Sequence, residues 1–170
     1  MKINIELSKK SIDEAIKKLN KLKTKYPWIK SEFVKRSLIF IESEANKNIK
    51  LFIAETNSAW YQSTGKLESS WIHDVAHGVL ENICDYAMWY EYGTGIVGAN
   101  NSHPSLKPEY IYDMNNHGEN GWSFTYEGEI HFTKGMKSHP YLHNAVSTYI
   151  RTQKYKEIFK SVVAEAEKGV

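Results

Sequence analysis

The strongest constraint on the fold is a run of apolar residues at helical spacing in residues 28–53. The stripe has members three and four residues apart, and two phenylalanines widen it: Val34, Leu38, Ile41, Ala45, Ile49 and Phe52, with Phe33 and Phe40. Residues at this spacing share one face of an α-helix, so the segment predicts a long amphipathic helix. Such a helix must bury its apolar side against other elements, and we expect it to lie on a small sheet.

A second amphipathic segment precedes this helix. Ile12, Ile16, Leu19 and Leu22 form an apolar stripe, and lysines occupy the opposite side. Pro27 follows, and proline has no backbone N–H and clashes with the preceding helical turn. We therefore expect the first helix to end before Pro27 and a second helix to begin just after it.

Shorter segments predict β-structure. Four of them have the apolar pattern of strands: residues 2–7, 70–78, 79–87 and 122–132. The second and third are expected to pair with a turn near Gly78, and the fourth is expected to be a hairpin that turns at Glu127 and Gly128. Residues 57–65 are polar and predict a loop.

The end of the chain is expected to be helical. Pro140 begins a region that reaches about Lys168, with a possible break at residues 152–154. Residues 96–121, rich in Gly, Asn, His and Pro, predict a long loop before it. The 170 residues therefore predict one α+β domain, in which a long N-terminal helix packs on a small, mostly antiparallel sheet and a C-terminal helix follows.

Charge is unevenly distributed along the chain. Residues 1–50 contain 13 Lys and Arg against 6 Asp and Glu, whereas residues 51–135 contain 3 against 11. Surfaces of opposite sign favour head-to-tail contact between copies, but solvated lysines on helix faces are the simpler explanation of the pattern. The single cysteine, Cys84, excludes an intrachain disulfide, and the chain has no apolar run of the roughly 20 residues that a membrane span needs.

Glycines and histidines invite enzymatic interpretations. Gly93, Gly95 and Gly98 have the spacing of a dinucleotide fingerprint, but the residues after them do not predict the helix that this motif requires. Two histidine pairs are four residues apart, and neither has the glutamate of a His-Glu-x-x-His zinc motif: His73 and His77, and His139 and His143. Cys84 is expected to be an inert thiol in an apolar strand. We predict no catalytic residue, metal or cofactor.

Two alternatives stay open at this point. A small metal-dependent hydrolase would use histidines of the region from His103 to His143, such as His131 or His139. A DNA-binding module would use the lysine-rich helices. In a binding surface for single strands, positive charge is interleaved with aromatic rings, yet here the lysines lie in residues 9–50 and the aromatic cluster at 86–92 contains Glu91.

That aromatic cluster adjoins a glycine turn. Tyr86, Trp89, Tyr90 and Tyr92 precede Gly93-Thr94-Gly95. Glycine reaches positive φ without steric cost, so we expect a sharp reversal that Glu91 and Thr94 tie through hydrogen bonds to its backbone. Some of the rings are expected to anchor the turn in the core and others to meet a neighbouring molecule, the simpler alternative being that all four are core.

Three short motifs occur in order along the chain. The first contains Thr64, Gly65, Leu67 and Ser70; the second Tyr86, Ala87, Trp89, Glu91, Tyr92, Gly93, Thr94 and Gly95; the third Gly135, Pro140, Tyr141, Leu142 and Ala145. Their order and spacing resemble the minor tail-component family of long-tailed phages, whose members are also described as head–tail joining, neck or tail-completion proteins. The chain differs from that pattern in lacking a proline before Thr64 and in the length of the segment between Gly95 and Gly135.

The resemblance implies a structural virion protein without enzymatic activity or cofactor. Its implied partners are other copies of itself in a ring, usually six-fold, and the connector, adaptor and tail proteins of a phage or prophage. It implies assembly in the bacterial cytoplasm and a place in the neck or tail, with no membrane and no specific nucleic acid as partner. The motif residues would then shape the fold and its interfaces.

Overall fold

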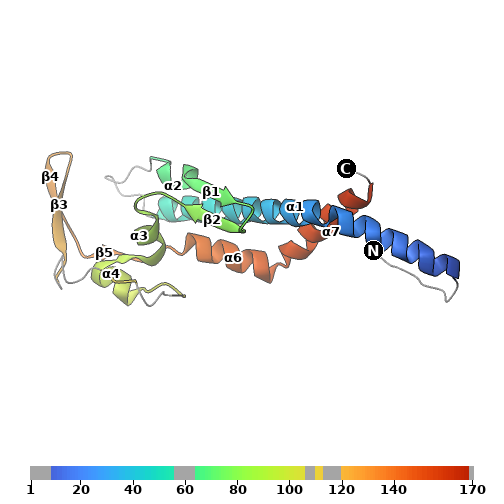
Figure 1. The fold of residues 1–170 in the computed structure, drawn as a ribbon. Helices are drawn as coiled ribbons and strands as arrows, with labels where there is room; N and C mark the ends of the chain where they lie inside the picture. The colour runs from blue at the N-terminus through green and yellow to red at the C-terminus, as the bar shows by residue number, and fades with distance from the viewer. Residues whose placement is uncertain (1–8, 56–63, 106–109, 113–119, 169–170) are drawn as a thin grey trace.

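The structure is a computed structural model that describes residues 9–55, 64–105, 110–112 and 120–168. It has the predicted α+β fold (Figure 1). The longer elements are α1 (Lys9–Glu55), α6 (Tyr141–Arg151), α7 (Lys154–Lys168) and two antiparallel pairs of strands, β1 (Trp71–Asp74) with β2 (Val79–Asn82) and β3 (Trp122–Tyr126) with β4 (Glu129–Thr133). The shorter ones are α2 (Lys66–Ser69), α3 (Ala87–Tyr92), α4 (Gly95–Asn100) and β5 (Gly135–Met136).

Helix α1 is continuous through Pro27, so the predicted interruption there is wrong. Proline in a helix interior removes one hydrogen bond and costs about 3 kcal/mol. Residues on both sides of the proline, Leu22 and Ile29, pack into the same apolar cluster with Ile158 and Val162 of α7. Tertiary packing on both sides of the proline holds the helix together and outweighs the local preference to break.

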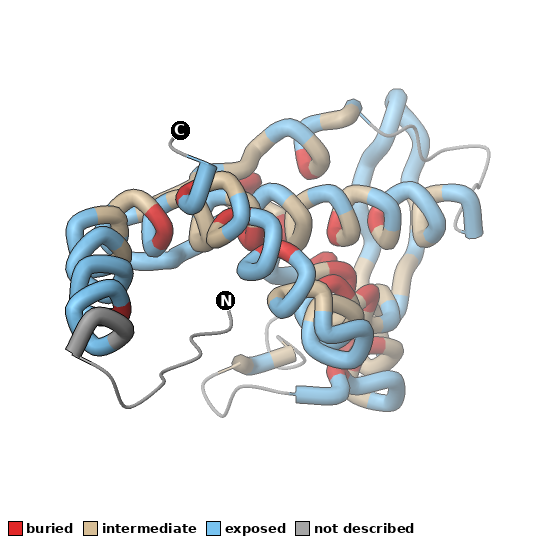
Figure 2. The backbone as a smooth tube through the Cα atoms, turned by 90° about the vertical axis from the view of Figure 1, so that its right-hand side faces the viewer, coloured by how far each residue is buried: buried red, intermediate tan, exposed pale blue. Residues whose placement is uncertain are grey.

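Helices α6 and α7 lie along α1, and the core forms between them (Figures 1 and 2). Ala45 and Ile49 of α1 are fully buried, as is Ala145 of α6. The predicted break between the last two helices is confirmed, because the chain changes direction at Gln153, which has a φ of 55°. This turn lets α7 follow the earlier part of α1 after α6 has followed the later part.

The β1–β2 sheet packs on α1 through one of its faces. Trp71 Nε1 donates to Asn46 Oδ1 at 2.9 Å, and His73 Nε2 lies 2.7 Å from Glu42 Oε2. The predicted pairing of these strands is confirmed, with Ile72 opposite Glu81. The second strand is shorter than expected, however, and Cys84 lies beyond its end rather than within it.

The β3–β4 hairpin extends away from the helices at one end of the molecule (Figure 1). Its predicted turn at Glu127 and Gly128 is confirmed, and both residues have positive φ. The hairpin pairs with no other strand among the described residues, so the β-structure consists of two separate sheets. Most hairpin side chains are exposed, which leaves it attached mainly through its two ends.

Several predicted segments lie partly or wholly outside the described residues. The expected strand at 2–7 and most of the expected loop at 57–65 belong to them. Of the long loop expected at 96–121, residues up to Asn100 instead form α4. In the described part of the chain, no helix has both the length and the apolar character of a membrane span.

Candidate functional site

The three sequence motifs meet in one buried cluster next to α1. Its fully or nearly buried members come from all three motifs, from α1 and from the turn after β2: Leu67, Ala87, Tyr90, Tyr141, Ala145, Ala45, Ile49 and Cys84. Leu142 and Tyr86 pack against the cluster from its edge. The motifs are far apart in sequence, so their meeting is a property of the tertiary structure, and the site is built around it.

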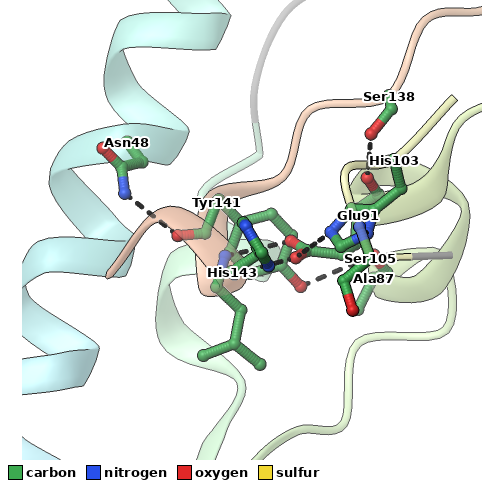
Figure 3. A network of polar contacts seen from close by, with 9 residues as sticks. Asn48, Ala87, Glu91, His103, Ser105, Ser138, Tyr141 and His143 are labelled. Atoms are coloured by element: carbon green, nitrogen blue, oxygen red, sulfur yellow. Dashed lines mark hydrogen bonds and ion pairs between the residues drawn. The ribbon is translucent and has the colours of Figure 1, made fainter. Parts of the chain in front are cut away.

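Glu91 connects the second motif to the third. Its side chain is buried, and its carboxylate accepts the backbone N–H of Leu142 at 3.0 Å and that of His143 at 2.9 Å (Figure 3). These amides are in the first turn of α6, where N–H groups have no partner inside the helix and where negative charge is favoured. Pro140 at the N-cap position has no side chain able to cap, and Glu91 takes over that role.

His103 completes the environment of this carboxylate. The buried His103 Nε2 lies 3.1 Å from Glu91 Oε1, while its Nδ1 accepts the backbone N–H of Ser105 at 3.0 Å. Since Nδ1 is an acceptor, the proton is on Nε2, which donates to Glu91. The ring packs on Tyr92 with centroids 4.6 Å apart and meets the His143 ring edge-on at 5.0 Å.

The glycines of the second motif permit close contact between two backbones. Residues 93–95 run beside residues 135–138, with bridges between Thr94 and Met136 and between Gly95 and Gly135. A Cβ on Gly93 would lie 2.7 Å from Met136 O, and one on Gly95 would lie 2.6 Å from Lys134 O. Both glycines have positive φ, as the sequence predicts, whereas Thr94 between them is extended and pairs with Met136.

Side chains from the same segments fasten the two backbones together. Thr94 Oγ1 accepts the N–H of Met136 at 3.1 Å, and the Ser138 hydroxyl donates to Glu91 O at 2.7 Å. The sequence predicts that Glu91 and Thr94 tie their own turn. Instead, their side chains bind backbone groups more than forty residues further along the chain.

Tyr141 and His139 lie inside the buried cluster where the three motifs meet, which is called the junction below. Tyr141 O accepts from the Asn48 side chain of α1 at 3.0 Å, and burial raises the pKa of the Tyr141 phenol well above its usual range (Figure 3). His139 is fully buried and stacks on Tyr90 with centroids 4.9 Å apart. Desolvation, with a smaller contribution from the Lys137 charge, lowers the pKa of His139 to about 4, so its ring is neutral near pH 7.

The first motif forms the segment of chain that leads directly into β1. Gly65, with a φ of 72°, is the N-cap of α2, and Leu67 places its side chain in the core. The Ser70 hydroxyl donates to Lys66 O at 2.6 Å, and Thr64 Oγ1 accepts the Lys66 N–H at 3.4 Å. A short helix, α2, therefore stands between the loop predicted at residues 57–65 and β1, and the exposed Thr64 contributes a local contact.

The aromatic residues of the second motif divide between core and surface, and contact of the exposed rings with a neighbouring molecule stays a prediction. Tyr90 is buried, whereas Trp89 is 55% exposed and lines a hollow of about 460 Å³. Its walls come from α3, β5 and the β3–β4 hairpin: Thr64, Tyr86, Trp89, Tyr90, Thr94, Trp122, Phe124, Thr133, Gly135 and Met136. The exposed rings make this an apolar surface at the edge of the motif cluster.

The residues considered for enzymatic chemistry have other partners or lie apart. His77 pairs with Asp74 and His73 with Glu42, and His139 precedes the helix that contains His143. The described residues contain no group of three His, Cys, Asp or Glu side chains placed to hold a metal ion. Cys84 is buried, with its Sγ 3.6 Å from Asp85 Oδ1.

Sequence reasoning missed two parts of the site. It did not assign Glu91 to the start of α6, and it did not place His103 beside Glu91. A proline before a helix that lacks a capping side chain was the available signal for the first, because the helix then needs an acceptor from elsewhere. No sequence signal pointed to His103.

Comparison with known proteins adds no relative to this picture. No protein-family model, curated protein sequence or solved structure matches the chain.

Proposed function

We propose that this protein is a non-enzymatic structural component of a tailed phage or prophage. It joins or completes the head–tail assembly at the neck or tail as a ring of identical copies, in contact with connector, adaptor and tail proteins. The particular observation that supports this proposal is the meeting of the three family-like motifs in one buried junction.

The chemistry of that junction fits a structural role for the motifs. The only carboxylate of the second motif caps α6 and accepts from His103, and its glycines allow two backbones to touch. These groups are used in holding elements together. A pattern whose residues specify architecture suits a protein that serves as a rigid building part.

The surface supports the same proposal. Large apolar side chains are exposed on the β3–β4 hairpin, among them Ile130 and Phe132, and Trp89 is exposed next to it. Exposed apolar groups gathered in one region are typical of surfaces that meet other proteins. In the proposed assembly, this end of the molecule contacts a neighbouring component of the neck or tail.

The test is deletion of the gene from the phage or prophage that encodes it, with electron microscopy of the induced lysate. The proposal expects filled heads and separate tails, or tails with abnormal ends, and recovery of infectious particles when the protein is supplied in trans. Ile39→Ala, at an exposed position of α1 outside this end of the molecule, is a control variant that should also restore infectivity. Normal infectious particles without the gene would refute the proposal, and metal content and DNA binding of the purified protein would then be measured.

A further inference from the structure

The N-terminal part of α1 carries an apolar stripe that the rest of the described chain leaves exposed. Ile12, Ile16 and Leu19 are between 42% and 51% exposed, and Lys23 continues the same line at the next helical step. Their spacing of four, three and four residues places all four side chains on one side of the helix. From residue 12 to residue 26, five lysines oppose two acidic residues, so this stripe lies on a basic stretch of helix.

The outer face of the β1–β2 sheet has the complementary character. Trp71 and His73 point to α1, and strand alternation therefore turns Ile72 and its cross-strand partner Glu81 to the other side. Val79 is on this outer side as well, and Ile83 follows just beyond the strand. Ile72, Val79 and Ile83 are between 47% and 59% exposed, while Glu81 and Asp74 supply negative charge.

One molecule cannot bring these two surfaces together. The sheet is held on α1 near Asn46, which lies 27 residues beyond Leu19 on the same continuous helix. At 1.5 Å per residue, this is about 40 Å along the helix axis, and even the β1–β2 turn at Gly78, which lies beside Val34, is about 22 Å beyond Leu19. The stripe projects at the opposite end of α1 from the sheet (Figure 1), so a contact between these two surfaces has to join two molecules.

We propose that the stripe Ile12–Ile16–Leu19–Lys23 of one copy docks on the outer β1–β2 face of a second copy. The inference rests on the proposed ring-forming role and assigns its subunit contact. The aliphatic residues of the stripe cover Ile72, Val79 and Ile83, and the lysines of the helix meet Glu81 and Asp74.

Charge and geometry together favour a second copy over an unrelated occupant. The stripe has three exposed aliphatic side chains with lysines nearby, and the outer face of the sheet has three exposed aliphatic side chains with carboxylates nearby. The same chain therefore carries both halves of the proposed contact. The two surfaces differ, which makes the contact heterologous. In an open row of subunits joined by such a contact, one end has a free stripe and the other end has a free β1–β2 face. Closure into a ring brings these two surfaces together.

Self-association of the purified full-length protein is the first test. In sedimentation velocity runs over a series of concentrations, the wild-type protein should form larger species, and Ile16→Glu should weaken this association by about tenfold or more. Ile39→Glu is the matched control, because Ile39 is similarly exposed on α1 but outside both surfaces. A wild-type protein that is monomeric at every concentration, or equal association of Ile16→Glu and wild type, would overturn the proposal.

A charge exchange tests which surfaces meet. Lys23→Glu and Glu81→Lys should each weaken association at low salt, and the double variant Lys23→Glu/Glu81→Lys should recover a large part of it, because the pair is reversed at every contact. Folding of each variant is checked by circular dichroism. If the double variant is as weak as the sum of the two single variants, the two residues do not face one another.

Cross-linking gives an independent measurement. Leu19→Cys mixed with Val79→Cys should form a disulfide-linked mixed dimer on oxidation, whereas Ile39→Cys mixed with Val79→Cys should not. The native Cys84 is buried and stays in all variants. Equal yields in the two mixtures would contradict the proposed pairing.

Complementation of the deletion separates this inference from the proposed function. If the deletion abolishes joined particles and Ile16→Glu restores them fully, the contact is wrong and the structural role stands. If the deletion has no effect on particles while the purified protein forms the cross-link, the contact stands and the structural role is wrong.

Discussion

The two halves of α1 have the same kind of sequence pattern and opposite surroundings. In the later half, Ala45 and Ile49 are fully buried beneath α6 and the motif cluster. In the earlier half, Ile12, Ile16 and Leu19 repeat at the same helical spacing and remain largely exposed. Periodicity tells which side of a helix is apolar, but only the path of the rest of the chain tells whether anything covers it.

The buried later half of α1 holds the fold together, whereas the exposed earlier half is available for contact with another molecule. The later half packs on the cluster where the three motifs meet. This cluster contains the buried Glu91 carboxylate, two backbones in close contact and the neutral His139. The earlier half is supported by α7 on one side only. Substitutions in the junction should therefore change folding, whereas those at the projecting stripe should leave the fold unchanged.

The largest effect is expected at Gly135. A Cβ there would lie 2.0 Å from Thr94 O, and its φ of 99° is unfavourable for any other residue. Gly135→Ala should reduce the free energy of unfolding by about 3 kcal/mol or more, measured by chemical denaturation. Gly128→Ala, with positive φ but open space, should cost only about 1 kcal/mol. Equal losses for the two variants would mean that the close contact with Thr94 is unimportant.

Removal of the Glu91 carboxylate is next. Glu91→Ala leaves two amides of α6 and the buried His103 without their acceptor, and should destabilise the protein by about 3 kcal/mol. The matched control is Asp85→Ala, which removes an exposed ion pair with Lys66 and should cost less than about 1 kcal/mol. If amide exchange in the first turn of α6 is unchanged in Glu91→Ala, the capping role is refuted.

Acid should weaken the junction through His139. Its pKa is lowered to about 4 in the folded protein from 6.5, so the unfolded chain binds a proton in this interval that the folded protein does not. As far as His139 is concerned, the free energy of unfolding is highest above pH 6.5. It decreases as the pH falls, by about 2 kcal/mol at pH 5. His139→Phe should flatten the pH dependence of stability between pH 6.5 and 5, and an unchanged slope would contradict this assignment.

The smallest effect on folding is expected at the projecting stripe. Ile16→Ala should change the free energy of unfolding by less than about 0.5 kcal/mol, as is usual for exposed positions. Ile49→Ala, at the same type of position in the buried half, should cost about 2–5 kcal/mol. A large loss for Ile16→Ala would show that the stripe is covered within the monomer and would end the contrast between the two halves.

The sequence predicted the elements of the fold better than their contacts. The α+β class, the β1–β2 pair, the β3–β4 hairpin and the break before α7 followed from local apolar spacing and turn residues. The continuation of α1 through Pro27 did not, because its cause is the packing of Leu22 and Ile29 on α7. Local preference is small beside the burial of several side chains, and burial depends on residues far away in sequence.

The site divides in the same way. The sequence by itself determined that Gly93 and Gly95 adopt positive φ next to a group of aromatic rings, because a missing Cβ and the apolar rings are properties of the residues themselves. Only the tertiary structure decided that Glu91 caps α6, that His103 donates to it and that the described part of the chain leaves the Ile16 side of α1 exposed. Those outcomes depend on which distant backbone groups come within hydrogen-bond reach, and chain topology alone sets that distance.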